Sequence, residues 1–220
     1  PGSNTETNGA IIIDSEHVSG NPLGGNSLYI YDWAGDQSTH IRRDLAAGQN
    51  LSAASVSFDF IPSEVAGEGE DDTRIHFSMG RSGMSLNSFA NRMFEIRMQN
   101  NGGFRVEHSR DGSGGDRGAS LAGTYDPASP QSVALFINSH SSSAASYDDG
   151  SLTGTVQPNT MDVYLSGDFV GTFVLLDVPN PSNPPIPGFH EADENLGQIA
   201  FYQDTSRDGG AIIDNLVIQE

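Results

Sequence analysis

The sequence predicts an all-β protein, an antiparallel β-sandwich of the jelly-roll type. Short runs of alternating apolar and polar residues recur along the whole chain of 220 residues, and clusters of Gly, Asn, Asp, Ser or Pro separate them. Glycine and proline together contribute 37 residues (26 plus 11), which is too much turn material for a helical protein. No helical apolar periodicity extends over three turns, and residues 85–93 are expected to form one turn at most.

The strand-like runs follow one another along the chain without a change of character. We therefore interpret residues 10–220 as a single jelly-roll domain, preceded by a cloning scar and flexible lead-in at residues 1–9. The proline-rich stretch 178–189 is expected to be a loop or a polyproline segment. Strands are expected at residues 10–14, 27–33, 54–62, 74–80, 93–99, 104–109, 132–138, 160–167, 169–178, 197–204 and 211–219.

Composition excludes several classes of function. The chain has no cysteine, which excludes a disulfide scaffold, a thiolate metal site and a cysteine nucleophile. It has no lysine either, which excludes Schiff-base chemistry and a phosphate-binding P-loop. The formal net charge of −19 argues against a nucleic-acid partner, because phosphates need a basic surface.

The acidic balance fits a secreted or cell-surface protein that is kept soluble in salty water, or one that binds calcium through its loops. No apolar stretch reaches the length of a membrane span, so no membrane partner is expected. No signal-peptide pattern is present, and we expect that a native signal has been removed.

One predicted hairpin, residues 94–110, sets arginines at regular spacing in this acidic chain. Because residues two apart share a face of a strand, its polar positions form one face and its apolar positions the other. The strands at 74–80, 160–167 and 197–204 divide in the same way. If these strands share one sheet, its outer face carries the candidate ligand-binding residues Arg74, His76, Glu95, Arg97, Gln99, Arg105, Tyr164 and Tyr202.

Arginine is concentrated in this part of the chain. Six of the ten arginines lie within the 37 residues from Arg74 to Arg110. The planar fork of arginine suits carboxylate and sulfate, so the favoured partner is an anionic polysaccharide, either a uronate polymer or a sulfated glycan. The alternative is that the charged residues pair across strands and only solubilise the sheet, each pair contributing about 0.2–1 kcal/mol.

The order of the strands resembles that of the concanavalin A-like, laminin-G-like jelly rolls, which occur as carbohydrate-binding modules and polysaccharide lyases in environmental bacteria. The stretch DVYLSGDFVGTF at 162–173 is similar to their D-V-Y/W-x-x-G hairpin, and AIIDNLVI at 211–218 resembles their closing strand. The resemblance implies a bacterial carbohydrate-binding module that grips a glycan on a concave sheet face. It also implies a monomer, or one module of a larger protein.

The same resemblance implies a second function, a small polysaccharide lyase that cleaves a uronate polymer by β-elimination. Lyases on this fold use an arginine, an amide, a histidine and a tyrosine, and the matching residues are His76, Arg97, Gln99 and Tyr202. Three positions depart from the alginate-lyase pattern. Met93 stands where that pattern has the first arginine of R-x-E-x-R, Arg74 replaces the amide of Q-I-H, and the late strand has no lysine. The E-x-D-x-x-E strand of the glucanases is absent, so hydrolysis is not expected.

Jelly rolls of this kind often hold a structural calcium between the first and last strands. The resemblance therefore implies calcium as a cofactor, with Asp14, Glu16 and Asp214 as its side-chain ligands. Because calcium takes six to eight oxygen ligands, these three carboxylates would supply only part of its shell.

Overall fold

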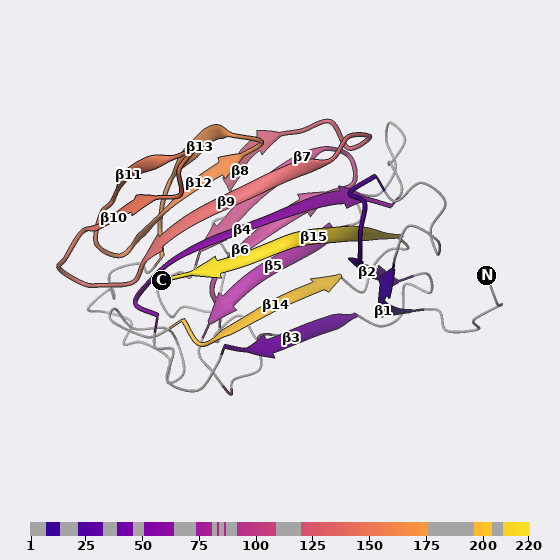
Figure 1. Ribbon diagram of the computed structural model, residues 1–220, viewed down its shortest axis with the longest axis horizontal. Coiled ribbons are helices and arrows are strands. Elements are labelled where there is room, and N and C mark those ends of the chain that lie inside the picture. Colours follow the sequence, from indigo (N-terminus) through magenta and orange to yellow (C-terminus); the bar gives the residue numbers. More distant parts are fainter. Residues whose placement is uncertain are drawn as a thin grey trace.

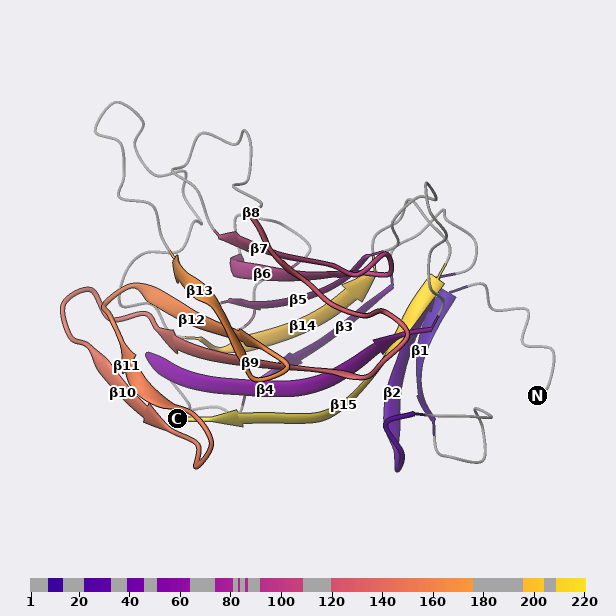
Figure 2. The same ribbon diagram turned by 90° about the horizontal axis from the view of Figure 1, so that it is seen from above.

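The computed structural model of the chain describes residues 8–13, 22–32, 39–45, 51–63, 74–80, 83, 86, 92–108, 120–175, 196–203 and 209–220. These residues form two large antiparallel sheets that lie face to face, as Figure 2 shows. The fold class predicted from the sequence is confirmed. Within the described ranges there is no helix long and apolar enough to span a bilayer.

The first sheet has seven strands in the order β1-β2-β15-β4-β9-β12-β13, and the second has six in the order β3-β14-β5-β6-β7-β8 (Figure 1). A separate hairpin, β10-β11, belongs to neither sheet. The strands are Asn8–Ile13 (β1), Ser27–Asp32 (β2), His40–Asp44 (β3), Ala53–Pro62 (β4), Arg74–Gly80 (β5), Arg92–Gln99 (β6), Gly103–His108 (β7), Ser120–Thr124 (β8), Gln131–Asn138 (β9), Ala145–Asp148 (β10), Thr153–Val156 (β11), Thr160–Leu165 (β12), Asp168–Val174 (β13), Gln198–Gln203 (β14) and Gly209–Gln219 (β15).

Each strand expected from the sequence is present, with ends shifted by a few residues. Four further strands were not predicted. The strands β3 and β8 have too little apolar alternation to stand out, since their sequences are HIRRD and SLAGT. The hairpin strands β10 and β11 are largely exposed, so burial imposes no apolar pattern on them.

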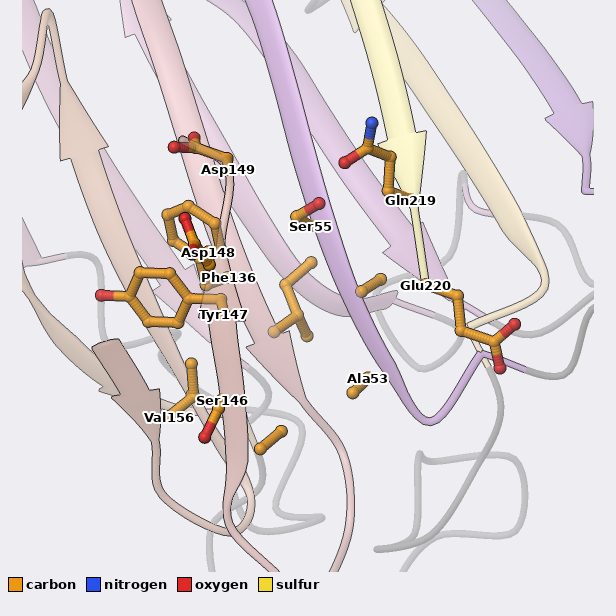
Figure 3. Close-up of a pocket in the computed structure, with 13 residues that line it drawn as sticks. Ala53, Ser55, Phe136, Ser146, Tyr147, Asp148, Asp149, Val156, Gln219 and Glu220 are labelled. Atoms are coloured by element: carbon orange, nitrogen blue, oxygen red, sulfur yellow. The ribbon is translucent and has the colours of Figure 1, made fainter. Parts of the chain in front are cut away.

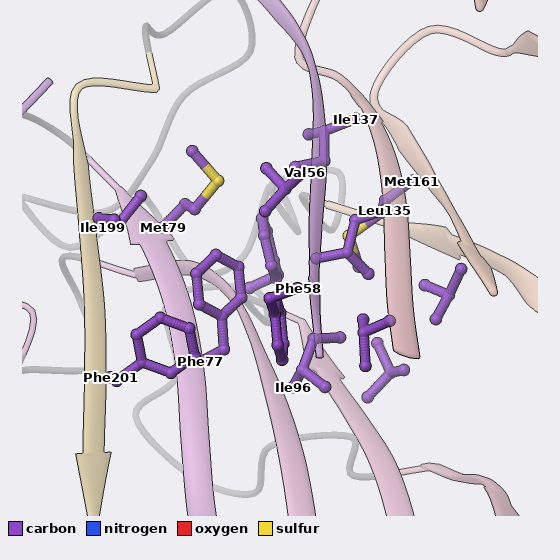
Figure 4. Packing of buried hydrophobic residues seen from close by; sticks show 14 of the residues in the cluster. Val56, Phe58, Phe77, Met79, Ile96, Leu135, Ile137, Met161, Ile199 and Phe201 are labelled. Atoms are coloured by element: carbon purple, nitrogen blue, oxygen red, sulfur yellow. The ribbon is translucent and has the colours of Figure 1, made fainter. Parts of the chain in front are cut away.

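The core lies between the sheets and is built from the apolar half of each alternating strand. Figure 4 shows Phe58 of β4 packed against Phe77 of β5 and Phe201 of β14. The ring centroid of Phe58 lies 5.1 Å from that of Phe77 and 5.2 Å from that of Phe201. Because these apolar residues point inward, their polar neighbours along β5, β6 and β14 point outward from the six-stranded sheet.

The sheet order brings together strands that are far apart in sequence. β14 lies between β3 and β5, so Tyr202 pairs with His40 on one side and with His76 on the other. Adjacent strands of a sheet are only about 4.8 Å apart, so this pairing places residues from the two ends of the chain in one site.

The turn between β6 and β7 depends on a glycine. Gly102 has a φ of 87°, and a Cβ added there would lie 2.4 Å from the carbonyl oxygen of Tyr125. We expect Gly102→Ala to lower the free energy of unfolding by about 2 kcal/mol, from backbone strain plus this clash. Gly83→Ala is the control, because Gly83 has a φ of 74° with nothing within 4 Å, and its cost should stay near 1 kcal/mol. Urea unfolding of both variants measures the difference, and equal losses would show that the clash is relieved.

Candidate functional site

The outward face of the six-stranded sheet carries two rows of side chains that cross the strands. The strand register places the members of each row directly opposite one another. The first row consists of His40, Tyr202, His76, Arg97 and Arg105, on β3, β14, β5, β6 and β7 in that order. The second row lies two residues away from the first on each strand. It consists of Arg42, Ala200, Ser78, Glu95 and Glu107.

Arg92 joins this face because of a β-bulge. Strict alternation from Glu95 would place Met93 on the polar face and Arg92 in the core. The register between β5 and β6 shifts between Met79 and Gly80, so that one residue of β6 is inserted there. Met93 is consequently buried in the core, and the guanidinium of Arg92 binds Glu95 on the outward face. Because of the bulge, an arginine reaches this end of the polar face from position 92, although strict alternation would have placed Met93 there.

Glu95 is the centre of a buried network. Its carboxylate is 3% exposed and accepts hydrogen bonds from four side chains. One oxygen, Oε1, accepts from Nδ1 of His76 at 2.7 Å and from Nε of Arg97 at 3.0 Å. The other, Oε2, accepts from Arg92 and from the hydroxyl of Tyr202 at 2.5 Å. Burial opposes ionisation of this carboxyl, but His76 and Arg92 outweigh it and hold the pKa of Glu95 well below its usual value.

Arg97 links the two rows and is held by two carboxylates. Its Nη2 donates to Glu107 at 2.7 Å, in addition to the bond from Nε to Glu95. Burial favours the neutral form of Arg97, but the two carboxylates outweigh this and raise its pKa. Beyond Arg97, Nε of Arg105 donates to the side-chain oxygen of Gln99 at 3.1 Å. The guanidinium of Arg97 is therefore fixed in orientation and permanently charged.

Tyr202 lies between two imidazole rings. Its ring centroid is 4.1 Å from that of His76 and 5.3 Å from that of His40, both nearly parallel, and the guanidinium carbon of Arg92 is 4.3 Å away. Burial and the charge of Glu95 raise the pKa of Tyr202, so that it remains a protonated donor at neutral pH. Burial and the charges of Arg92, Arg42 and His76 lower the pKa of His40, so that its ring is neutral there.

The structure brings seven of the eight sequence candidates onto this one face: Arg74, His76, Glu95, Arg97, Gln99, Arg105 and Tyr202. The placement of Tyr164 is wrong. Tyr164 lies on β12 of the seven-stranded sheet, opposite Ala134, and its hydroxyl is 2.8 Å from that of Tyr147. Alternation correctly turned it away from the core, but it does not report which sheet a strand joins.

Sequence reasoning missed Arg92, His40 and Arg42. The two β3 residues were missed because β3 itself has no apolar alternation. For Arg92 a signal was present: an arginine three residues before Glu95, instead of two, is the spacing that a single inserted residue produces.

Two buried polar atoms on this face have no hydrogen-bond partner among the described residues. They are Oγ of Ser78 and the side-chain oxygen of Gln198, whose residues are 0% and 5% exposed. Each has a small residue on one neighbouring strand, Ala200 beside Ser78 and Gly80 beside Gln198, and a carboxylate residue on the other, Glu95 and Asp44 respectively. Because native proteins rarely leave such atoms unsatisfied, this part of the face has hydrogen-bonding capacity for a ligand or an ordered water.

Only one of the three expected calcium ligands, Asp214, lies in the described part of the chain. Asp14 and Glu16 are outside the described residues. Asp214 lies opposite Asp59, and it accepts hydrogen bonds from Ser27 at 3.1 Å and from the backbone of Asn215 at 2.7 Å. In the described part of the chain no three His, Cys, Asp or Glu side chains are grouped to hold a metal. Two carboxylates supply only part of a calcium shell, so the calcium site stays a prediction.

No family model matches the chain, and no curated protein matches its sequence. Solved structures share its fold. An endo-β-1,4-glucuronan lyase from the fungus Trichoderma reesei matches with a TM-score of 0.54 at 12% identity, over 97% of this chain and 87% of that one. An alginate lyase from Pseudomonas aeruginosa matches with a TM-score of 0.52 at 12% identity, over 88% and 82%.

A sialidase also matches, with a TM-score of 0.52 at 15% identity, over 90% of this chain. The chain spans only 16% of that protein's length. Identities this low report a shared fold. The protein therefore has the concanavalin A-like jelly-roll fold found in these carbohydrate-active proteins.

Proposed function

We propose that the protein binds an anionic polysaccharide, a uronate polymer or a sulfated glycan, on the outward face of the six-stranded sheet. The observation that carries the proposal is the segregation of charge. Every arginine that the structure describes lies on this sheet: Arg42, Arg43, Arg74, Arg92, Arg97 and Arg105.

Five of these six arginines lie on the outward face, since Arg43 pairs with the core residue Ile199 and so points the other way. Of the described carboxylates, three share this face, namely Asp44, Glu95 and Glu107. The face therefore carries an excess of positive charge in a chain whose formal charge is −19. Solubility alone does not require such an arrangement, and arginine forks are suited to planar carboxylates and to sulfates.

The rigidity of the network also supports recognition. The carboxylates of Glu95 and Glu107 fix Arg97, and Gln99 fixes Arg105. Side chains that are already ordered lose little conformational entropy when a ligand binds. A secreted or cell-surface location, with the glycan outside the cell, is part of the proposal.

The test is migration in native affinity gels that contain polyguluronate, polymannuronate, glucuronan, polygalacturonate or a sulfated galactan, with neutral dextran as the blank. We expect retardation by at least one anionic polymer. Arg97→Lys should weaken that binding about tenfold or more, because lysine keeps the charge that Glu95 and Glu107 need but loses the planar fork. The matched control is Arg43→Lys on the opposite side of the same sheet, which should bind as the wild type does. No retardation by any anion, or equal weakening in both variants, would contradict the proposal.

A second prediction concerns Ser78, whose buried hydroxyl has no partner among the described residues. Ser78→Ala should raise the free energy of unfolding by about 1 kcal/mol, because an unsatisfied buried polar group is removed. It should also weaken glycan binding, because that hydroxyl is then unavailable to the ligand. Ser139→Ala is the control, since Oγ of Ser139 is buried and donates to the carbonyl of Ser52 at 2.8 Å, so its loss should destabilise. Unchanged or lower stability with unchanged binding would contradict both expectations and assign the hydroxyl of Ser78 to an ordered water.

A second candidate function is β-elimination on the same face. The observation that favours it is the register of the first row, which places Tyr202, His76 and Arg97 on three adjacent strands. Elimination needs a cation at the uronate carboxylate, a base for the proton at the adjacent carbon and an acid for the departing glycosidic oxygen. In this second proposal Arg97 is the cation, and His76 and the protonated phenol of Tyr202 are the candidates for the proton transfers. Ultraviolet absorbance of unsaturated uronate ends, followed in the same polymer mixtures, tests for this reaction.

A further inference from the structure

The seven-stranded sheet has a groove on its outer face, on the side of the molecule away from the arginines. Its volume is about 260 Å³. Figure 3 shows the hairpin residues Tyr147, Asp148 and Asp149 on one side and Gln219 and Glu220 on the other, with Ser55 between them. None of the sequence candidates lies here.

The β10-β11 hairpin forms one wall, and three sets of contacts fix it. The buried side-chain amide of Asn138 donates to the carbonyl groups of Ser143 at 2.8 Å and of Val156 at 3.2 Å. The ring of Tyr147 stacks on Phe136 with centroids 3.7 Å apart and planes at 13°. The hydroxyl of Tyr147 also bonds to that of Tyr164. Because a two-stranded hairpin alone is marginally stable, these contacts are what hold the wall in place.

The floor of the groove is low because its side chains are small. The register forms a row across the sheet from Gln219 through Ser55 to Phe136, and Ala53 is the next outward residue of β4. Within the hairpin, Gly154 leaves room for the side chain of its partner Tyr147, since a Cβ at residue 154 would lie 2.4 Å from the hydroxyl oxygen of Tyr147. Because Ser55 and Ala53 are small and lie between the hairpin and the end of β15, the groove stays open to solvent.

The chemistry of the lining selects the ligand. Oδ1 of Asp148 accepts from the backbone of Gly150, and Oδ1 of Asp149 accepts from the backbone of Ser151 and Leu152. Both carboxylates are thereby oriented, and ionised carboxylates only accept hydrogen bonds. Among the described residues that line it there is no arginine, lysine or histidine. A polyanion is therefore repelled, and the ligand must bring hydrogen-bond donors.

The carboxylates of the groove lie on its two sides, Asp148 and Asp149 on the hairpin and Glu220 after β15, as Figure 3 shows. Asp148 and Asp149 are consecutive residues at a strand end, and in the described part of the chain no three acidic or histidine side chains group around a cation position. The half-buried side chains of Ala53, Ala145 and Tyr147 supply apolar surface beside these carboxylates, while Phe136 and Val156 lie buried beneath them. Spaced acceptors above an apolar floor match the hydroxyls and C–H faces of a sugar chain better than a single cationic centre.

We propose that this groove binds a segment of a neutral glycan. The protein would then have two carbohydrate sites of opposite electrostatic character, one on each sheet. This site stands on different residues from those of the anionic site, so either can fail without the other.

The experiment is calorimetric titration of the whole chain with neutral hexasaccharides of β-1,4-glucose, β-1,3-glucose and β-1,4-mannose. We expect one of them to bind, and Ser55→Trp to weaken it about tenfold or more by filling the floor. Ser57→Trp is the matched control, because Ser57 is the next outward residue of the same strand and does not line the groove, and it should bind as the wild type does. Asp148→Asn should also weaken binding severalfold while keeping its turn.

Three results would overturn the inference. The first is that no neutral hexasaccharide binds at millimolar concentration. The second is that Ser55→Trp leaves the binding of a neutral glycan unchanged. The third is that only chitosan oligomers or a lysine-rich peptide bind, which would make the groove a cation site. Arg97→Lys should leave neutral-glycan binding unchanged, which separates this site from the anionic one.

Discussion

Replacing Glu95 with alanine is expected to lower the free energy of unfolding by about 3–5 kcal/mol, the usual cost of removing one partner from a buried ion pair. Glu95 is 3% exposed, and Arg92, beside it, is 5% exposed. Without the carboxylate, the buried side chains of Arg92 and His76 would lose its negative charge and the hydrogen bonds that it accepts from them. Neither side chain can reach water without disturbing the sheet face on which it lies.

Glu107→Ala is the matched control for this loss. Glu107 is equally buried and also binds Arg97, but Arg97 keeps its bond to Glu95 in that variant. We therefore expect a clearly smaller loss for Glu107→Ala in urea unfolding monitored by tryptophan fluorescence and by circular dichroism. Equal losses in the two variants would mean that the cost comes from packing and not from the buried charges.

The pH dependence of stability provides an independent measure of the same network. The folded-state pKa of Glu95 is depressed, so its ionised form contributes stability at pH values above the unfolded pKa of about 4.3. This contribution is lost as the pH falls below that value toward the lower folded-state pKa. Between pH 7 and pH 3, the wild type should therefore lose more stability than Glu95→Ala does. Parallel curves for the two proteins would contradict a depressed pKa.

Alternation along the strands was enough to predict most of the polar face. Along β5, the side chains of Arg74, His76 and Ser78 point away from the core. Those of Ile75 and Phe77 point into it, as the period of two along a strand requires. Burial enforces this pattern residue by residue, which is why a single sequence reveals it.

Alternation does not predict which strands pair with one another or where a β-bulge interrupts a strand. Tyr164 has the expected inside–outside orientation, but β12 belongs to the other sheet, and only long-range pairing decides this. Arg92 would be a core residue under strict alternation, and one inserted residue reverses its side. Alternation therefore predicted which side chains of these strands point away from the core, while strand pairing and the bulge determined which of them share one face.

The two sheets also differ in a way that composition hides. A net charge of −19 suggests a uniformly acidic surface, yet the described arginines gather on one sheet, and the groove on the other is lined by carboxylates. Charges of one sign at a face focus ligands of the other sign, and this effect weakens with salt. Binding of an anionic polymer should therefore weaken as salt is added, whereas a neutral glycan in the groove should be nearly insensitive to it.

Replacing Tyr202 with phenylalanine is expected to separate binding from chemistry on the arginine-bearing face. The substitution removes one hydroxyl, which donates to Glu95 at 2.5 Å and accepts from Nη1 of Arg92 at 2.6 Å, and it keeps the ring that stacks on His76. Arg92 still holds the carboxylate, so the fold and the affinity for an anionic polymer should change little. If the wild type releases unsaturated uronate, Tyr202→Phe should lower that rate by about 10²–10⁴-fold, the range lost with a general acid or base.

Initial rates of ultraviolet absorbance, measured beside affinity gels on the same polymer, give both quantities for each variant. His140→Phe is the control for loss of a hydrogen-bonding ring away from the site, since His140 lies after β9 and its ring is 3.0 Å from the hydroxyl of Ser52. Retained binding with lost turnover in Tyr202→Phe alone would make the phenol a catalytic residue of a lyase. Unchanged turnover would contradict that role and move the proton transfer to His76. Retained binding in both variants, with no unsaturated uronate from the wild type, would leave recognition as the function of this face, because the arginines would then bind the polymer without any proton transfer from Tyr202.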